Sequence, residues 1–211
     1  GVKLPFVSYF LMPNAAVLDS RMTLTLPPHI TAMTGMDALT HAVESFTCLA
    51  HNPISDAYAN GAIKKIADNL LHVLDNPTDA DGRLELAQAS TMAGVAFSNA
   101  MVGLVHALGH SLGAVCHLPH GLCMNLFLPY VLEYNKAVNG DRIGELLLPL
   151  AGADVYAATP KAQRADKAIE VIRQMRDALY ERCKLPRTLL ETGKVREDQL
   201  EQIADLAIND G

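Results

Sequence analysis

The stretch Gly35–Glu44, with the sequence GMDALTHAVE, carries an acid and an imidazole four residues apart among largely apolar neighbours. Residues four apart on an α-helix lie on one face, one turn from each other. We therefore expect a helix over about Thr34–Leu49 that presents Asp37 and His41 together. Because a buried aspartate without a partner is costly, this pattern favours a divalent cation that a neighbouring helix helps to bind.

A second polar pair lies downstream, where four of the eight histidines fall within residues 104–121. His106 and His110 are again four residues apart, and His120 follows at a Pro/Gly break. Three imidazoles with one carboxylate form a ligand set suited to iron or zinc. Taken singly, each pattern also fits a surface pair, a solvated helix face or a turn. Their joint occurrence in segments that are otherwise apolar and helical in pattern favours a metal site.

The rest of the chain predicts an all-α helical bundle, preceded by a short strand-like segment. From about Ile30, after a boundary at Pro27-Pro28, the sequence pattern predicts helices. Before this boundary, Phe6–Leu11 and Ala15–Asp19 are apolar runs of strand length, which predict a short N-terminal β remnant. Further helices are expected from the cap Ser55 to Asn76, over Arg83–Asn99, over Leu104–Val115, from Leu122 with a bend or break near Pro129, and over Asp141–Leu150, Lys161–Cys183 and Glu197–Ile208.

Composition and charge argue against several classes of function. The formal net charge is -6 and no cluster of Lys and Arg stands out, so the chain should not bind nucleic acid. No apolar run reaches the roughly 18 residues of a membrane span, and no leader-like segment opens the chain, which predicts a cytoplasmic protein without a membrane partner. We expect reduced, mostly buried thiols at the four cysteines, because none of the short paired spacings of zinc ribbons occurs among Cys48, Cys116, Cys123 and Cys183.

In order and separation, several motifs resemble the iron-containing (group III) alcohol dehydrogenases. These motifs are Leu26–Glu44, the stretch NPISDA at residues 52–57, Gly103–His110 and Pro119-His120-Gly121. The resemblance covers nearly the whole chain and implies the C-terminal helical domain of that family, whose fold is dehydroquinate synthase-like. It implies that residues 29–211 form this metal-binding domain, truncated at its C-terminal end. By the same resemblance, residues 1–28 are the end of a missing nucleotide-binding α/β domain.

The resemblance also implies roles for individual residues. Four residues match the family's metal ligands, namely Asp37, His41, His106 and His120. His110 matches an additional histidine beside the metal, near the reacting carbon and the nicotinamide, and is the candidate catalytic residue. Phe97 falls where the family places an aromatic residue in the substrate pocket, although plain core packing explains this residue equally well.

The function implied by this resemblance is reversible hydride transfer between an alcohol and NAD(P)+, with the metal polarising the alcohol or carbonyl oxygen. Iron (Fe2+) is the expected metal and zinc the second choice. The complete enzyme would use NAD or NADP with a small alcohol or aldehyde, as a homo-oligomer. The family's Gly-rich phosphate loop has no counterpart here, so we expect this chain to supply the metal and substrate half only, and to be inactive alone. Two alternatives stay open: metal-assisted hydrolysis on the same ligands, and a non-catalytic helical module with a structural metal.

Overall fold

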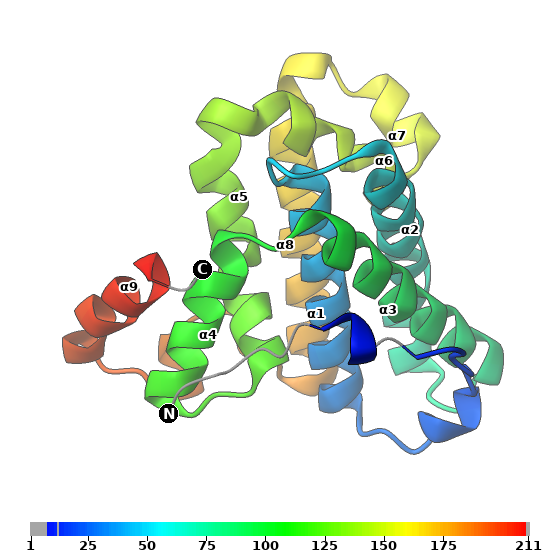
Figure 1. The fold of residues 1–211 in the computed structure, drawn as a ribbon, viewed down its shortest axis with the longest axis horizontal. Helices are drawn as coiled ribbons and strands as arrows, with labels where there is room; N and C mark the ends of the chain where they lie inside the picture. Colours follow the sequence, from blue (N-terminus) through cyan, green and yellow to red (C-terminus); the bar gives the residue numbers. More distant parts are fainter. Residues whose placement is uncertain (1–7, 12, 210–211) are drawn as a thin grey trace.

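Helices dominate the part of the chain that this computed structural model describes, residues 8–11 and 13–209 (Figure 1). The α-helices are α1 (Pro28–Thr47), α2 (Pro53–Asp75), α3 (Ala80–Ala100), α4 (Leu104–Cys116), α5 (His120–Glu145), α6 (Leu147–Ala151), α7 (Ala153–Ala158), α8 (Arg164–Cys183) and α9 (Leu200–Ile208). Short 3-10 helices are η1 (Tyr9–Leu11), η2 (Ser20–Met22), η3 (Lys161–Gln163), η4 (Leu190–Thr192) and η5 (Glu197–Gln199). The described residues contain no strand, and the all-α class expected from the sequence is confirmed.

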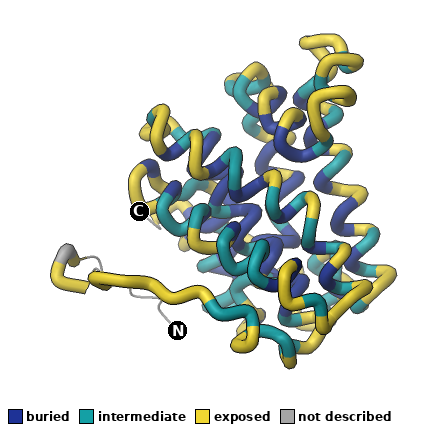
Figure 2. Tube along the Cα trace, turned by 90° about the vertical axis from the view of Figure 1, so that its right-hand side faces the viewer, coloured by how far each residue is buried: buried dark blue, intermediate teal, exposed yellow. Residues whose placement is uncertain are grey.

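The strands expected near the N-terminus are not formed in the described residues. Tyr9–Leu11 is a 3-10 turn, and the run from Ala15 to Leu18 has no regular structure. Phe6 and Val7, which belonged to the first expected strand, lie outside the described residues. A strand is stable only beside hydrogen-bonding neighbours, and the described residues offer none. Figure 2 shows this exposed N-terminal segment extending away from the helical body.

Helix α1 lies at the centre of the bundle, where it packs against α2, α3, α5 and α8 (Figure 1). Small residues allow its neighbours to come close: a Cβ added at Gly35 would lie 2.5 Å from Leu70 Cδ1 of α2. The helix begins at Pro28, six residues before the expected start at Thr34. Proline suits this first position because its φ is already helical and its missing N–H would have no helical partner there. The centre of the fold is therefore one long, largely buried helix.

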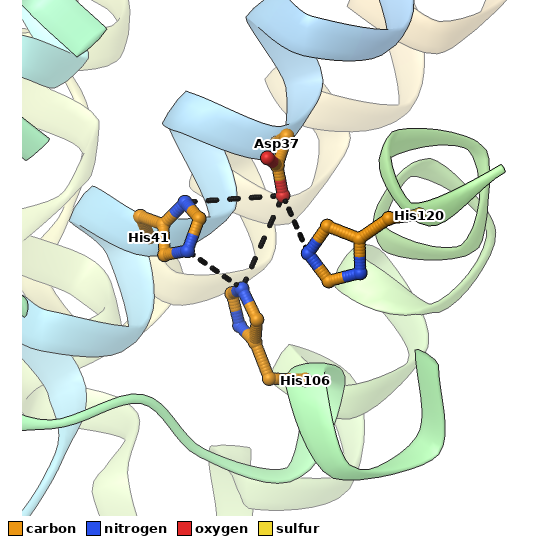
Figure 3. Close-up of side chains that lie close together, drawn as sticks. All are labelled: Asp37, His41, His106 and His120. Carbon is orange, nitrogen blue, oxygen red and sulfur yellow. Dashed lines mark hydrogen bonds and ion pairs between the residues drawn. The ribbon is translucent and has the colours of Figure 1, made fainter. Parts of the chain in front are cut away.

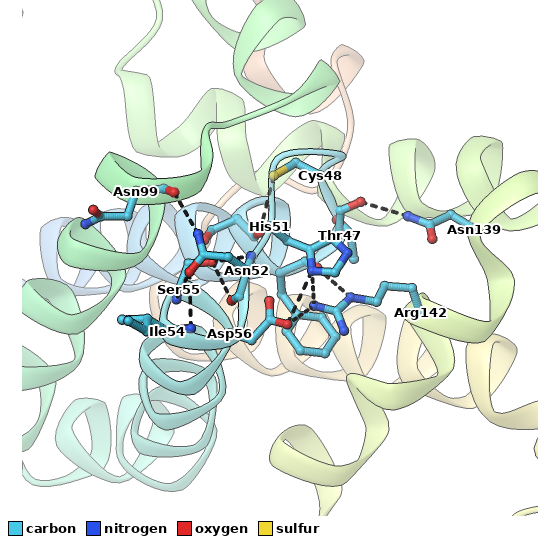
Figure 4. A network of polar contacts seen from close by, with 12 residues as sticks. Thr47, Cys48, His51, Asn52, Ile54, Ser55, Asp56, Asn99, Asn139 and Arg142 are labelled. Carbon is cyan, nitrogen blue, oxygen red and sulfur yellow. Dashed lines mark hydrogen bonds and ion pairs between the residues drawn. The ribbon is translucent and has the colours of Figure 1, made fainter.

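The C-terminal end of α1 is fixed by side chains from α5, as Figure 4 shows. Arg142 Nε donates to the carbonyl of Phe46 at 2.8 Å, and Asn139 Nδ2 donates to the carbonyl of Thr47 at 2.8 Å. Arg142 also pairs with Asp56 of α2, with 2.5 Å between the guanidinium and the carboxylate. The last carbonyls of a helix have no partner within the helix, so these contacts satisfy them. They also hold α1, α2 and α5 in fixed relative positions.

Several expected helix ends differ from the structure for local reasons. Ser55 is not the cap of α2: Asn52 caps it, accepting from Ile54 N at 3.1 Å and Ser55 N at 3.0 Å. The hydroxyl of Ser55 in turn accepts from Asn52 N at 2.9 Å, which completes a capping box. Helix α5 continues through the buried Pro129, where a bend or break was expected, and its backbone leaves helical geometry only at Asn139.

The helices expected in the C-terminal half are also divided differently. The helix expected over Asp141–Leu150 is split between the end of α5 and the short α6, and the short helix α7 was not predicted. The helices expected from Lys161 and from Glu197 each begin with a 3-10 turn, η3 and η5, before α8 and α9. The order of the long helices is nevertheless as expected.

Helices α3 and α4 meet at a sharp bend beside the C-terminal part of α1, near Glu44. No single helix in the described ranges is long and apolar enough to cross a membrane. Among these residues only α3 and α4 taken together have the length and composition of a membrane span, and this pair is bent by 106°. Residues 101–103 form the break, and Met101 has a positive φ of 130°. The bend brings the first turn of α4 against α1.

Candidate metal centre

Asp37 and His41 stand one turn apart on α1, as their spacing predicted. Their side chains are 25% and 19% exposed, respectively, so they are largely withdrawn from water although they are polar. His41 Nδ1 lies 3.8 Å from Asp37 Oδ1. The residues between them, Ala38, Leu39 and Thr40, are buried in the bundle, which fixes the rotation of α1 about its axis. The acid and the imidazole therefore face the same space beside α1.

Two further imidazoles reach this space from α4 and α5 (Figure 3). His106 lies in the first turn of α4, directly after the bend, and is 2% exposed. His120 is the first residue of α5 and follows Pro119, whose extended backbone ends the connection from α4. Three helices thus contribute to one cluster. His106 and His120 meet in it although they are fourteen residues apart along the chain.

The four side chains lie close enough to share one ion. One possible ligand atom from each of Asp37, His41, His106 and His120 lies within 4.8 Å of all the others. Asp37 Oδ1 is 3.2 Å from His120 Nε2 and 4.0 Å from His106 Nε2. His106 Nε2 and His41 Nε2 are 3.0 Å apart.

The state of Asp37 suits a cation. Its Oδ1 is buried and has no hydrogen-bond donor among the described residues, in spite of the three neighbouring rings. Burial by itself would raise the pKa of Asp37, but contact with His120 and the proximity of His41 and His106 outweigh it, and the pKa is lowered. A buried carboxylate oxygen that lacks a donor is costly unless something positive meets it. The residues present therefore fit a divalent metal ion.

The protonation state of His41 also suits a metal ligand. Burial, followed by the proximity of His106, lowers the pKa of His41 to about 4. At neutral pH its ring is therefore uncharged and offers a nitrogen lone pair. Metal ions bind the neutral imidazole and the ionised carboxylate, so Asp37 and His41 are both in the form that a ligand needs.

Glu44 belongs to this site, although no role was predicted for it from the sequence. It lies one turn beyond His41 on α1 and is 4% exposed. Glu44 Oε2 is 2.5 Å from His106 Nδ1, the ring nitrogen opposite the cluster. A signal was available in the sequence, because positions 37, 41 and 44 follow the four-then-three spacing of one helix face.

The structure places the other candidate residues at the edge of the cluster. The His110 ring is stacked on that of His120 with centroids 5.2 Å apart, and its centroid is 5.6 Å from that of His106. The Phe97 ring, on α3, stacks on His41 with centroids 4.4 Å apart. His117, the remaining histidine of the His-rich span, is exposed at the left-handed end of α4 and is not one of the four clustered residues.

These features define a helical domain with a three-histidine, one-aspartate cluster, and comparisons with known proteins agree with that class. Residues 31–211 match the model of the Fe-containing alcohol dehydrogenase family, C-terminal. The chain is 35% identical over 210 residues to a 1,3-propanediol dehydrogenase from Klebsiella pneumoniae, covering 100% of this chain and 52% of that protein. It is 33% identical over 205 residues to an NADPH-dependent butanol dehydrogenase from Clostridium saccharobutylicum, covering 97% and 50%, respectively.

A solved structure gives the same result for the fold. A crystal structure of a 1,3-propanediol oxidoreductase superposes with a TM-score of 0.85 at 34% identity, over 92% of this chain and 49% of that one. The chain belongs to the iron-containing alcohol dehydrogenase family, and it corresponds to the family's C-terminal helical domain. It spans about half the length of the curated relatives that it matches.

Proposed function

We propose that this chain is the metal-binding and substrate-binding half of an alcohol dehydrogenase that transfers hydride reversibly between a small alcohol and NAD or NADP. The observation that carries the proposal is the cluster of Asp37, His41, His106 and His120, whose ligand atoms lie within 4.8 Å of one another in a member of this family. Iron is the metal we propose, with zinc as the second choice, because both accept imidazole and carboxylate ligands.

The four clustered residues would hold the ion, and they come from three helices that the core fixes. When bound, a divalent ion supplies Lewis acidity toward the oxygen of an alcohol or a carbonyl substrate. The protein's own part is to keep Asp37 ionised and His41 neutral in a site that is mostly withdrawn from water. Because the set holds four ligands, a metal that accepts five or six would retain room for substrate.

Two neighbours of the cluster would act on the substrate rather than on the metal. His110 lies against the ring of His120, a position from which an imidazole would relay the alcohol proton toward solvent or shape the pocket near the nicotinamide. Phe97 covers one face of His41 and would form an apolar wall for the carbon chain of the substrate. A variant with His110→Ala should therefore slow turnover while retaining the metal.

The nucleotide would bind elsewhere. We propose that residues 1–28 are the end of a nucleotide-binding α/β domain, and that the helical domain of residues 29–211 works beside such a domain in a homo-oligomeric enzyme. The relatives' greater length supports this arrangement, since the chain covers only 50% and 52% of the two dehydrogenases above.

Elemental analysis of the purified chain tests the metal centre first. We expect about one iron or zinc per chain under conditions that retain weakly held iron, and loss of the metal in the double variant Asp37→Ala/His106→Ala. His117→Ala is the matched control, because this exposed histidine lies in the same His-rich span but outside the cluster. Absence of metal from the wild-type chain, or equal metal in the double variant, would remove the basis of the proposal.

Activity is tested by joining this chain to the N-terminal half of a relative, such as the 1,3-propanediol dehydrogenase. We expect the chimera to reduce NAD+ or NADP+ with small primary alcohols, and to lose at least about 100-fold in kcat/KM when Asp37 is replaced by alanine. A folded, metal-loaded chimera that hydrolysed esters or phosphates without nucleotide would support the hydrolase alternative instead.

A further inference from the structure

We propose that Glu44 is a positioning residue that fixes both the His106 ring and the start of α4 for metal binding. This inference rests on the metal centre of the proposed function. It assigns a role to a carboxylate that lies outside the four clustered residues and whose two oxygens both contact α4.

The contacts of Glu44 are short and buried. Oε2 lies 2.5 Å from His106 Nδ1, and Oε1 accepts the backbone N–H of Val105 at 2.6 Å. Glu44 is 4% exposed and His106 is 2% exposed, so water has little access to either. A buried carboxylate needs partners for both oxygens, and here the two partners are consecutive residues of one helix.

The first contact decides which nitrogen of His106 faces the cluster with a lone pair. An ionised carboxylate only accepts hydrogen bonds, so His106 Nδ1 must carry the ring proton. The opposite nitrogen, Nε2, then has a free lone pair, and it is the atom that lies 4.0 Å from Asp37 Oδ1 and 3.0 Å from His41 Nε2.

The second contact holds the helix on which His106 is built. Helix α4 has no cap of its own, because Gly103 stands at its N-cap position and offers no side chain. The first N–H groups of a helix lack partners within it, and negative charge is favourable at this end. Glu44 satisfies the N–H of Val105 from a different helix. The glycine also leaves space for the carboxylate, because a Cβ at position 103 would lie 3.1 Å from Glu44 Oε1.

Glu44→Gln separates orientation from bulk, because glutamine has the same shape but one oxygen. The amide oxygen can occupy only one of the two positions that the carboxylate oxygens hold, so it cannot accept from Val105 N–H on one side and from His106 Nδ1–H on the other. The backbone N–H cannot become an acceptor, whereas an imidazole can exchange its tautomer, so we expect the amide NH2 to face His106. The ring proton would then move to Nε2, the atom that the metal needs.

The test measures Zn2+ affinity by competition with a chelating dye, and the tautomer of His106 by 15N NMR in the metal-free chain. In the wild-type chain we expect His106 to carry its proton on Nδ1. In Glu44→Gln we expect the proton on Nε2 and Zn2+ binding weaker by about 10- to 100-fold. Glu85→Gln is the matched control, because Glu85 pairs with Lys65 at the edge of the bundle, and both readouts should stay at their wild-type values.

Specific results would overturn the proposal. A wild-type His106 protonated on Nε2 would do so without any variant, as would Glu44→Gln with an Nδ1 proton and wild-type affinity for Zn2+. If the wild-type chain bound no Zn2+ or iron, the proposed function would fail, and the NMR measurement alone would still decide whether Glu44 orients His106. If Glu44→Gln failed to fold, the tautomer of His106 in the wild-type chain would still decide whether Glu44 orients the ring.

Discussion

At the scale of single residues, buried polar groups differ in whether the protein itself satisfies them. Arg83 is 3% exposed, and its guanidinium donates to Thr31 Oγ1 at 2.7 Å and to the carbonyl of Pro77 at 3.1 Å. Asp37 Oδ1 is also buried, yet it has no hydrogen-bond partner among the described residues, although three imidazoles surround it. Stability alone explains the first arrangement, because the buried charge has its hydrogen bonds. Stability alone does not explain the arrangement around Asp37, and we therefore interpret the cluster as a binding site.

The cysteines show a different consequence of burial at the same scale. The described residues contain no disulfide, and the four cysteines are free; Cys116 and Cys123 are buried, whereas Cys48 and Cys183, also expected to be mostly buried, are half-buried. Cys123 is 0% exposed, and burial raises the pKa of its thiol to about 12. A thiolate is the reactive form of cysteine, so Cys123 should be inert at neutral pH.

This shift predicts how stability depends on alkaline pH. The folded pKa of Cys123 lies above the unfolded value near 9, so burial of the neutral thiol stabilises the fold fully below that value. The contribution is lost as the pH rises from about 9 toward 12, at up to about 1.4 kcal/mol per pH unit. Urea unfolding at pH 8, 9, 10 and 11 measures it.

Cys123→Ala is the control for this prediction, because lysines and tyrosines titrate alike in both proteins. The free energy of unfolding of the variant should fall less steeply above pH 9 than that of the wild type. Parallel pH profiles for the two proteins would show that the thiol does not contribute.

At the scale of elements, the long helices were predictable and their ends were not. Apolar periodicity and the Pro and Asn boundaries indicated α1 to α5 and α8, because these signals are local. The bend or break predicted at Pro129 was wrong, because tertiary packing keeps α5 helical there. The backbone of α5 leaves helical geometry at Asn139 instead, where the side chain donates a hydrogen bond to the end of α1, far away in sequence. The N-terminal runs had strand composition, but composition cannot supply a neighbouring strand.

The bend between α3 and α4 is the element most directly tied to the cluster, and it contains backbone strain. Met101 has φ 130° and ψ 174°, a region that only glycine enters freely, and such a conformation costs about 1–3 kcal/mol. The Met101 side chain is 65% exposed, so little packing is lost by removing it.

Met101→Gly should therefore stabilise the chain by about 1 kcal/mol, after the entropy that glycine loses on folding is subtracted. Denaturant unfolding measures this gain as a higher midpoint with an unchanged slope. Met101→Ala also removes the side chain but keeps a Cβ, so it should give no gain. Equal midpoints for the two variants would show that the strain at position 101 is not what limits stability.

At the scale of the whole molecule, the cluster depends on how three helices cross. The sequence showed that Asp37 and His41 share one face, and that His106 and His110 share another, because each pair belongs to one helix. The family resemblance suggested that His120 joins them and that His110 does not. Only the fold shows how close the groups lie, with α1, α4 and α5 meeting beside the bend. The spacing places Glu44 on the same helix face as Asp37 and His41, but its contact with His106 was not predictable, because His106 is on a different helix.

A metal ion shared by α1, α4 and α5 would bind the folded chain and not the unfolded one, so it should raise the thermal midpoint. At a free metal concentration 100 times Kd the gain is about 2.7 kcal/mol, which corresponds to about 6 °C for a chain of this size. Calorimetry of the metal-free chain, before and after addition of Zn2+ or anaerobic Fe2+, measures the shift. His120→Ala should abolish it, because α5 would no longer reach the ion, whereas the exposed His117→Ala should leave it unchanged. A shift of equal size in both variants would mean that the ion binds elsewhere, and that the cluster does not join the three helices through a metal.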